Sequence, residues 1–397
     1  MVKPEVRLYG FNDDWKEWRL GNWGATYGGL TGKTKRDFGH GLAQYVPYLN
    51  VFSNPVMDQT NLERTPVDTS QNQVKAGDVL FTTSSEVPEE VGMSSVVFEV
   101  GENVYLNSFC FGFRPNRKIV PTFWAPMLRG PNVRAQFKTL AQGISRFNIS
   151  PKRAMDVSVH VPAEEEQEAV GEFFTQMDAA ITQSEVRLEK LRQYKQTMLH
   201  KMFPSGTSRV PEIRFEGFEG EWTQIELAKV VKRVTAFSTD ARLPRIEFED
   251  IISGSGRLNK DPKTKSSAKQ GIAFTAGDVL FGKLRPYLKN WMKPEFDGVA
   301  VGDFWVLRAA GVDANFLYSL IQTESFQEVA NITAGSKMPR SSWEVVSTTL
   351  FAIPSTTQEQ ARVGNFFEAL DLAINAEEEK LLKFKNLKVT FLAKMLV

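Results

Sequence analysis

The amino-acid sequence predicts an α+β protein with two similar, mixed β-rich globular domains, each followed by a long α-helix, and with the two helices packed against each other. Three observations lead to this prediction. The 397 residues are too many for one ordinary hydrophobic core, the two halves carry the same motifs in the same order, and each half ends in a segment with heptad periodicity. We expect globular domains at 1–162 and 206–356, and helical regions at 163–205 and 357–397.

The repeat is visible in four pairs of segments. Pro4–Leu20 (PEVRLYGFNDDWKEWRL) aligns with Pro211–Leu227 (PEIRFEGFEGEWTQIEL), Lys75–Phe81 (KAGDVLF) with Thr275–Phe281 (TAGDVLF), the polar loop that Gly143 opens (GISRFNIS) with the loop that Gly335 opens (GSKMPRSS), and Val161–Phe174 with Ile353–Phe367. The number of residues between equivalent positions of the two copies decreases along the chain. Because the matched segments themselves align, the differences in length lie in the loops between them. The chain is therefore expected to be a tandem duplication of one unit of roughly 200 residues.

The first part of each unit has the composition of a β-rich domain. It is rich in Gly, Pro, aromatic and β-branched residues, and short alternating runs such as Val97–Phe109 and Gly298–Ala309 predict strands between turns. A few helices are expected among them. Asp313–Asn331 has apolar residues at helical spacing behind a capping aspartate, which predicts one of these helices.

The second part of each unit predicts a long helix with one apolar seam. The seam residues step by fours and threes, and they are Val170, Phe174, Met177, Ile181, Leu188, Leu191 and Met198 in the first copy and Val363, Phe367, Leu370, Ile374, Leu381, Phe384 and Phe391 in the second. Both seams are interrupted at equivalent places, by Ser184 and Lys195 in the first copy and by Glu377 and Lys388 in the second. A single helix of this kind would be expected to lie on its own domain, but two seams with matched interruptions favour pairing of the helices with each other.

Composition narrows the class of protein. The one cysteine, Cys110, excludes an intrachain disulfide, and the sequence shows neither a leader pattern nor an apolar run approaching the roughly 18 residues that span a bilayer. We therefore expect a cytoplasmic protein without a membrane role. Because 48 lysines and arginines balance 47 aspartates and glutamates, net charge neither indicates nor excludes a nucleic-acid partner.

The order of these motifs resembles that of a known family. The twofold repeat, PEIRFEGFEGEW, AGDVLFGKLRPY, the Gly-led polar loop and the helix-opening segment with Glu, Gln, Val and Phe-Phe together resemble the specificity subunits of type I restriction-modification systems. The resemblance covers essentially the whole chain. The first half departs from the pattern, since KAGDVLFTTSSEV lacks the KLRPY extension that follows Phe281.

The resemblance implies a DNA-recognition subunit with two target-recognition domains and two antiparallel conserved helices. It also implies partners: double-stranded DNA, two modification (methyltransferase) subunits that bring S-adenosylmethionine, and restriction subunits that bring ATP-driven translocation and cleavage. No cofactor is expected on this chain. Outward-facing helix residues, among them Glu185, Arg187, Arg192 and Glu378, are expected docking contacts.

A duplicated domain with a paired helix suits the reading of a divided DNA site. The major groove faces the same side of the duplex once per turn, about 34 Å, so two readers on one face need a fixed separation. Because the two globular sequences differ, each is expected to read a different half-site. The target is therefore expected to be bipartite and asymmetric, with an unread spacer set by the length of the helices.

The DNA contacts are expected on polar and basic loops. Glycine allows the backbone to approach DNA closely, and arginine can bond a guanine edge through two hydrogen bonds. A single basic residue is more often a solvated surface charge, so position in the repeat carries the prediction. The candidate DNA-binding residues are Lys33, Lys35, Arg36, Gly143, Ser145 and Arg146 in the first half, and Lys263, Lys265, Lys283, Arg285, Tyr287, Gly335, Ser336, Lys337 and Arg340 in the second.

Three patterns resemble catalytic or metal sites, and none of them is complete. The segment Gly28–Thr34 lacks the first glycine of a phosphate-binding loop, because Tyr27 occupies that position. Ser53–Val56 lacks the second proline and the aromatic residue of the Asn-Pro-Pro-aromatic motif of DNA amino-methyltransferases. His40, His160 and His200 have no zinc-ligand spacing. We expect a non-catalytic chain without metal.

Two other function classes remain open from the sequence. One is a coiled-coil scaffold that binds only proteins, which failure to bind DNA even with modification subunits would support. The other is a DNA methyltransferase or nuclease acting alone, which activity of the purified chain would support.

Overall fold

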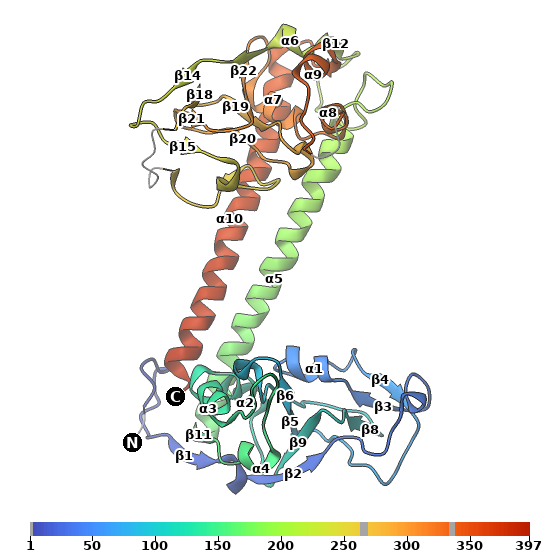
Figure 1. Ribbon diagram of the computed structural model, residues 1–397, viewed down its shortest axis with the longest axis vertical. Coiled ribbons are helices and arrows are strands. Elements are labelled where there is room, and N and C mark those ends of the chain that lie inside the picture. Colours follow the sequence, from blue (N-terminus) through green and yellow to red (C-terminus); the bar gives the residue numbers. More distant parts are fainter. Residues whose placement is uncertain (1–2, 263–268, 333–337) are drawn as a thin grey trace. The chain divides into compact units, whose positions relative to one another are not determined.

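The computed structural model describes residues 3–262, 269–332 and 338–397. The chain divides into two compact units, Met1–Glu185 with Lys380–Val397, and Val186–Glu379. Each unit contains one globular part and sections of the two long helices, α5 (Glu164–Met202) and α10 (Thr357–Met395) (Figure 1). In the described part of the chain, no helix has the length and apolar character that a membrane span requires.

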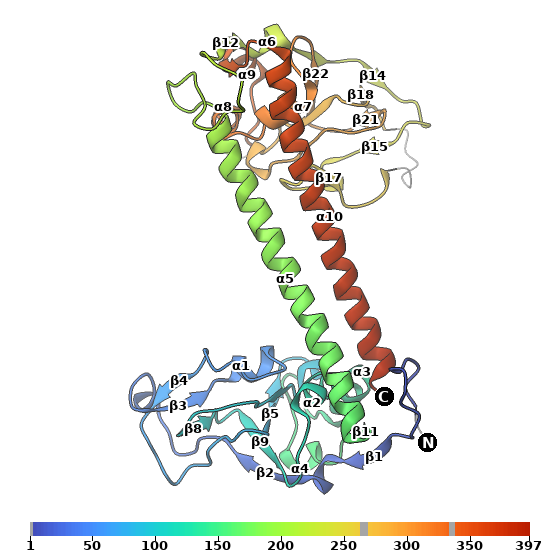
Figure 2. The same ribbon diagram turned by 180° about the vertical axis from the view of Figure 1, so that it is seen from behind.

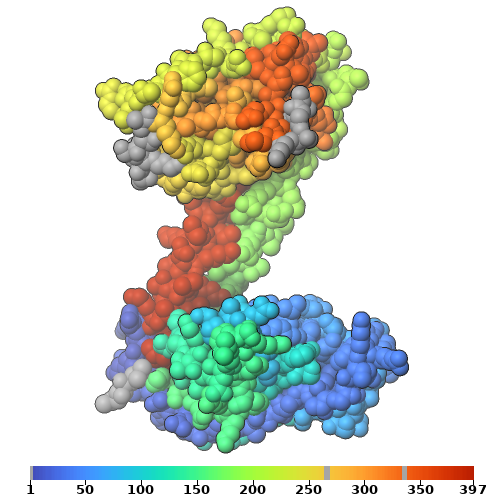
Figure 3. Space-filling model, viewed as in Figure 1, coloured from blue at the N-terminus to red at the C-terminus, as the bar shows by residue number. Residues whose placement is uncertain are grey.

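The first unit is built around a four-stranded antiparallel sheet with the order β2-β9-β5-β7. A three-stranded sheet, β4-β3-β8, and the pairs β1–β11 and β6–β10 accompany it. The segment from α2 to α4, teal to green in Figure 3, covers one face of the unit. The strands are β1 (Lys16–Arg19), β2 (Gly24–Gly28), β3 (Ala43–Val46), β4 (Glu63–Thr65), β5 (Val79–Thr82), β6 (Ser84–Ser85), β7 (Ser94–Val96), β8 (Val104–Leu106), β9 (Cys110–Pro115), β10 (Phe147–Asn148) and β11 (Ser158–Val161). The helices are α1 (Tyr48–Ser53), α2 (Pro121–Leu128), α3 (Pro131–Leu140) and α4 (Pro151–Ala154), with short 3₁₀ helices η1 (Leu20–Asn22), η2 (Lys35–Asp37) and η3 (Pro88–Glu90).

The second unit repeats this plan. Its central antiparallel sheet has the order β13-β22-β19-β20, and β14-β18-β21-β15, β12–β23 and β16–β17 accompany it. The strands are β12 (Thr223–Glu226), β13 (Val231–Val234), β14 (Phe237–Ser238), β15 (Arg245–Ile246), β16 (Ile251–Ile252), β17 (Arg257–Leu258), β18 (Gly271–Phe274), β19 (Val279–Gly282), β20 (Trp291–Met292), β21 (Gly298–Ala300), β22 (Phe304–Ala309) and β23 (Leu350–Ile353). The helices are α6 (Leu227–Val230), α7 (Ala314–Leu320), α8 (Glu324–Ala330) and α9 (Trp343–Thr348), with η4 (Phe248–Asp250) and η6 (Pro286–Leu288). The prediction of two similar mixed β-rich domains is confirmed.

The GDVLF motif forms the same strand in both units. Each copy, β5 and β19, is an inner strand of its central sheet, and all four residues of each strand are buried. The glycine before each strand has a positive φ, +84° at Gly77 and +86° at Gly277. This backbone region favours glycine over residues with a Cβ atom, so the motif records a tight turn into a buried strand.

The repeat also preserves arginine–carboxylate pairs. Each unit has one such carboxylate beside the buried strand and another at the start of the long helix. Each carboxylate accepts two N–H bonds from an arginine of its own. The pairs are Arg114–Asp78 and Arg7–Glu166 in the first unit, and Arg308–Asp278 and Arg214–Glu359 in the second. All of these contacts measure between 2.6 and 2.8 Å, the range of charge-assisted bonds.

The helix expected at Asp313–Asn331 is two helices, α7 and α8. The expected cap is confirmed, since the Asp313 carboxylate accepts a bond from the Phe316 N–H at 2.9 Å. The helix ends after Leu320, and the hydroxyl of Thr323 then caps α8. Threonine competes for backbone N–H groups and so favours a new helix start.

Each hydrophobic core is closed by the end of the helix that follows the other globular domain. The first core contains residues from the start of α5, Val170 and Phe174, and from the end of α10 and just beyond it, Met395 and Leu396. The second core contains residues from the start of α10, Val363 and Phe367, and from the end of α5 and just beyond it, Leu199, Met202 and Phe203. Each globular domain is thus packed with two helix sections.

One glycine in each long helix marks a close approach between helices. A Cβ atom at Gly171 would lie 2.3 Å from the Thr122 hydroxyl at the start of α2, and one at Gly364 would lie 2.5 Å from the Phe316 nitrogen in α7. Distances below 3.0 Å require the backbone or its neighbour to move. These glycines, which helix propensity disfavours, are explained by this contact.

Within each unit the sections of α5 and α10 run side by side in opposite directions (Figures 1 and 2). In the first unit, Asp178 pairs with Lys388 and Glu185 with Lys385, so later residues of one helix meet earlier residues of the other. The order is the same in the second unit, where Arg192 pairs with Glu378 and Lys195 with Asp371. All seam positions are buried or half-buried, and the predicted antiparallel coiled coil is confirmed in both units.

The four helix residues expected to face outward as docking contacts form ion pairs between the helices, and three of them, Glu185, Arg187 and Arg192, are exposed as expected. Glu185 lies 2.7 Å from Lys385, Arg187 lies 3.4 Å from Glu377, and Arg192 lies 2.5 Å from Glu378. Glu378 is also largely buried, with 15% of its side chain exposed. Side chains at the flanks of a coiled-coil seam commonly pair across it. The docking role of these residues stays a prediction.

Candidate nucleic-acid interface

The polar loops predicted from Gly143 and Gly335 end beside the segment that follows the GDVLF strand in each unit. In the first unit, β10 pairs with β6, and the Ile149 N–H donates to the Thr83 carbonyl at 2.9 Å. In the second, Arg340 forms a bridge with Leu284, and the Ser341 N–H donates to the Lys283 carbonyl at 2.9 Å. The structure therefore joins the loop to the segment that follows the GDVLF strand, two candidate regions that are far apart in the sequence.

The first loop is a tight hairpin with an exposed tip. Gln142 and Asn148 exchange backbone hydrogen bonds of 2.9 and 2.8 Å at its base. Gly143 has φ +142°, and a Cβ atom there would lie 2.0 Å from the Arg146 carbonyl oxygen. Glycine at this position therefore serves the loop geometry. At the tip, Ile144 is 97% exposed.

Ser145 and Arg146 line a hollow of about 800 Å³ on the first unit. The Arg146 guanidinium donates to the Ser84 hydroxyl at 3.1 Å, which holds the side chain against β6. The other lining residues come from α1, from β6 and the segment after it, and from the turn before β9. They are Tyr48, Leu49, Phe52, Ser84, Ser85, Glu86, Val87, Glu90 and Phe109. The loop residues predicted from the repeat thus border an apolar and charged depression.

In the second unit, two predicted cations share one carboxylate. Asp303, in the turn before β22, lies 3.5 Å from Lys283 and 3.0 Å from Arg340. Arg285 is exposed with a left-handed backbone, φ +49°, and Tyr287 is 55% exposed on η6. The structure brings Lys283 and Arg340 together on Asp303, and the Arg285 N–H donates to the Pro339 carbonyl beside Arg340 at 2.7 Å. Sequence reasoning missed Asp303, because nothing in the local sequence indicates that the turn lies against the distant loop.

Lys33, Lys35 and Arg36 lie on a different part of the first unit. Lys35 and Arg36 belong to η2, whose start is capped by Thr34. Lys33 donates to the Asp68 carboxylate at 2.6 Å. This bond is the main cause that lowers the pKa of Asp68 and raises the pKa of Lys33. Lys33 is held by Asp68, whereas Arg146 is held by Ser84. The candidates at 33–36 and those at 143–146 are therefore anchored at separate places in the first unit.

Five of the candidate residues lie outside the described residues: Lys263, Lys265, Gly335, Ser336 and Lys337. Other residues in the hollow were missed by sequence reasoning. Glu86, Leu49 and Phe109 lie on three separate segments, and no spacing in the sequence signals that they meet.

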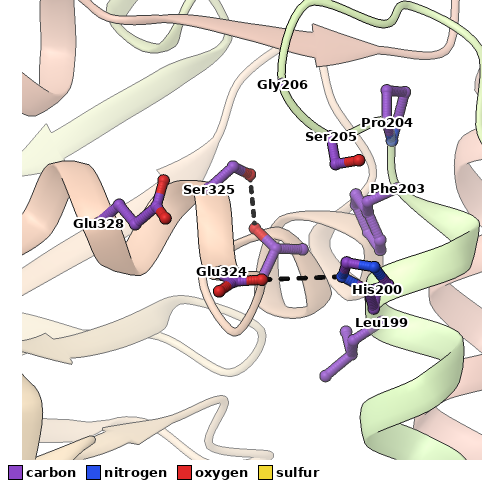
Figure 4. Close-up of a pocket in the computed structure, with 10 residues that line it drawn as sticks. Leu199, His200, Phe203, Pro204, Ser205, Gly206, Glu324, Ser325 and Glu328 are labelled. Carbon is purple, nitrogen blue, oxygen red and sulfur yellow. Dashed lines mark hydrogen bonds and ion pairs between the residues drawn. The ribbon is translucent and has the colours of Figure 1, made fainter.

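A small pocket lies in the second unit, where α5 ends (Figure 4). His200 lies 3.7 Å from the Glu324 carboxylate, beyond hydrogen-bond distance, and the space measures about 100 Å³. Among the described residues no hydroxyl group is bonded to His200, and no group of three potential metal ligands is present in that part of the chain.

The chain was compared with curated proteins and solved structures. The type I restriction enzyme EcoDI specificity subunit of Escherichia coli is 21% identical over 277 residues, which cover 60% of this chain and 61% of that protein. The alignment thus spans less than two thirds of that relative. No protein-family model matches.

Three solved structures match nearly the whole chain. The S subunit of a type I restriction-modification system from M. genitalium has a TM-score of 0.61 and 13% identity, with 100% of this chain and 99% of that chain covered. A structure that describes the structural basis of complex assembly and conformational transition of the type I R-M system has a TM-score of 0.58 and 15% identity, with 97% and 98% covered. The HsdS subunit from Thermoanaerobacter tengcongensis has a TM-score of 0.51 and 15% identity, with 97% of each chain covered. The chain therefore has the fold of type I restriction-modification S subunits, and the resemblance to specificity subunits that the sequence motifs indicate is confirmed.

Proposed function

We propose that this chain is the DNA-recognition subunit of a type I restriction-modification complex. The observation that carries the proposal is the repeated pairing of a Gly-led polar loop with the segment after the same buried strand. The side chains at this place differ between the units, with Ser145 and Arg146 in one and Lys283 and Arg340 in the other. One architecture with two sets of polar side chains suits the reading of two different DNA sequences.

In this proposal residues 1–162 and 206–356 are the two target-recognition domains, and 163–205 and 357–397 are the helical regions that connect them. The site is bipartite and asymmetric. Two modification subunits and the restriction subunits supply methyl transfer, translocation and cleavage, and this chain is non-catalytic and holds no cofactor itself. A subunit that reads cellular and foreign DNA would work in the cytoplasm.

Exchange of one recognition domain tests the division of labour. Residues 206–356 are replaced by the equivalent domain of another specificity subunit, and the methylome of cells that also express the modification subunits is sequenced. We expect one half-site to change and the other to persist. An unchanged motif, or a change in both halves, contradicts the proposal, and methyl transfer by the purified chain alone would favour the enzyme alternative.

Two basic side chains test the proposed interface in the second domain. Lys283→Ala with Arg340→Ala removes two cations, and DNA affinity of the complex with modification subunits is measured at several salt concentrations. We expect weaker binding and a shallower salt dependence, because each lost phosphate contact reduces the slope of log K against log salt by about 0.9. Lys229→Ala, an exposed lysine 3.7 Å from Glu226 in the same unit, is the matched control. If the complex with the wild-type chain bound no DNA, the scaffold alternative would be favoured.

A further inference from the structure

The hollow beside Arg146 has a rim of uncovered apolar side chains. Leu49 is 67% exposed, Phe109 is 55% exposed and Val87 is 42% exposed, and all three line the same depression. Single exposed apolar residues are common on protein surfaces, but several around one concavity indicate a contact surface. The hollow therefore has the character of a binding site.

The charges in the hollow are mixed. Arg146 uses one nitrogen for the Ser84 hydroxyl. Glu90 accepts a bond from the Ser85 hydroxyl at 2.8 Å, and Glu86 is exposed without a hydrogen bond or ion pair in the described part of the chain. One cation thus stands among two carboxylates. This balance repels a phosphate group, which carries negative charge.

The edge of a base pair offers partners for all three kinds of side chain in the hollow: the arginine, the carboxylates and the apolar residues. In the major groove, guanine presents two acceptors that suit an arginine, cytosine and adenine present amino donors that suit a carboxylate, and thymine presents a methyl group that suits an apolar side chain. A carboxylate in a DNA interface is favourable where it meets such an amino group and unfavourable elsewhere, so it discriminates between bases.

The second unit differs at the corresponding place. The carbonyls of Thr83 and Lys283 accept equivalent bonds from the returning loops, so the two segments correspond. There the second unit carries Lys283, with Arg340 nearby and Asp303 between them, whereas the first carries a threonine followed by serines. The first unit therefore has one cation against β6 and an apolar rim where the second has a pair of cations.

We propose that the hollow is where the first domain reads base edges, and that Glu86 and Phe109 determine the first half-site together with Arg146. Glu86 selects a cytosine or adenine amino group, Arg146 a guanine, and Phe109 with Leu49 a thymine methyl group. The inference rests on the proposed function, because it assigns a ligand to one domain of a DNA-recognition subunit.

The test compares methylomes of cells that express the modification subunits with wild-type chain, Glu86→Gln, Phe109→Ala or Arg146→Ala. We expect each variant to relax selection at a position of the first half-site, by roughly 5-fold to 150-fold for a contact of 1–3 kcal/mol, and to leave the second half-site unchanged. Val67→Ala, at an apolar residue that is 46% exposed outside the hollow, and Glu102→Gln, at an exposed carboxylate of the same unit, are matched controls and are expected to keep the wild-type motif.

The outcomes separate this inference from the proposed function. If wild-type chain directs no bipartite motif, the proposed function fails and the inference with it. If wild-type chain directs such a motif and Glu86→Gln and Phe109→Ala both keep its first half, only the inference is overturned. A phosphate-binding hollow would also overturn it, and in that case Glu86→Gln would strengthen binding to all DNA sequences alike. We expect Glu86→Gln to leave the salt dependence of binding unchanged.

Discussion

Lys33 shows how a candidate DNA-binding residue is already engaged within the protein. Its ammonium donates to Asp68, whose other contacts are the Ser70 hydroxyl and N–H and the Gln71 amide. These donors favour the charged carboxylate, and the Lys33 bond is the largest cause that lowers the pKa of Asp68. A DNA phosphate at this place would compete with Asp68 for the lysine.

The lowered pKa of Asp68 predicts a pH-dependent contribution to stability. A carboxylate with a lower pKa in the folded than in the unfolded state stabilises the fold above the unfolded pKa of about 3.9, and the contribution is lost as pH falls toward the folded pKa. Asp68→Asn is therefore expected to be less stable than wild type at pH 6, with the difference shrinking below about pH 4. Urea unfolding across this range measures it. Glu102→Gln is the control, and a difference that grows on acidification would contradict the prediction.

At the scale of the elements, the three charged interruptions of the helix seams, Lys195, Glu377 and Lys388, form ion pairs with the opposite helix. Lys195 donates to Asp371 at 2.5 Å and to the Gln322 amide oxygen at 2.6 Å, and Lys388 donates to Asp178. Equivalent lysines thus meet equivalent aspartates. In the second unit the pair is largely buried, with 8% and 20% of the side chains exposed, and burial raises the pKa of Asp371.

A double-mutant cycle on the buried pair tests its energetics. Lys195→Met leaves the Asp371 carboxylate buried without its cation and is expected to cost about 3–5 kcal/mol. Lys195→Met with Asp371→Leu removes both charges and is expected to recover most of that loss, since apolar replacement of a buried pair is often neutral or stabilising. Urea unfolding of the single and double variants measures the coupling.

The exposed pair between the same helices provides the matched control for that cycle. Lys385 and Glu185 have about half of each side chain exposed, and their coupling is expected to be about 0–1 kcal/mol. Equal coupling energies for the buried and the exposed pair would contradict the assignment of Lys195 and Asp371 to a desolvated contact.

The helix glycines lead to a second prediction at this scale. Gly364→Ala gains about 1 kcal/mol of helix propensity, but its Cβ atom would lie 2.5 Å from the Phe316 nitrogen and 2.7 Å from the Asn315 Cβ. Overpacking typically costs about 1–3 kcal/mol, so we expect a net loss of stability in thermal unfolding. Ala369→Gly, at an exposed position of the same helix, calibrates the propensity term. A stabilised Gly364→Ala variant would contradict the prediction and would show that α7 can shift away from α10 at little cost.

Heptad spacing predicts the helix pairing because a seam depends on local periodicity, and both the seam residues and the matched interruptions lie where that periodicity placed them. The partners Asp178 and Asp371 are harder to find, since an aspartate beside a seam is indistinguishable from a solvated one until the opposite helix is in place. The same reasoning applies to the candidate interface. The repeat indicates the loop at Gly143, whereas Asp303, Glu86 and Phe109 reach their places only through long-range packing.

At the scale of the whole molecule, the two halves of the sequence are not the two halves of the fold. Each unit combines a globular domain with the first section of its own helix and the last section of the other. The first core depends on Met395 and Leu396, each 2% exposed, and the second on Leu199 and Met202, 4% and 3% exposed. Stability of each domain is therefore linked to sequence from the other half of the chain.

Reciprocal core substitutions test this exchange. Met395→Ala with Leu396→Ala removes apolar atoms from the core of the first unit, and each large-to-small change in a core costs about 2–5 kcal/mol. We expect hydrogen exchange measured by mass spectrometry to accelerate in the β5 and α2 segments, although the substitutions lie at the far end of the sequence, while β19 and α7 keep their protection. Leu199→Ala with Met202→Ala is the matched variant and is expected to have the opposite pattern, with faster exchange in β19 and α7. Both pairs of substitutions lie near the end of a long helix, so fraying of that helix is the alternative explanation. Fraying alone would accelerate exchange only within α10 or α5, and not in the globular domain. Exchange that stays normal in β5 and α2 after Met395→Ala with Leu396→Ala would mean that the first domain does not depend on the last turn of α10.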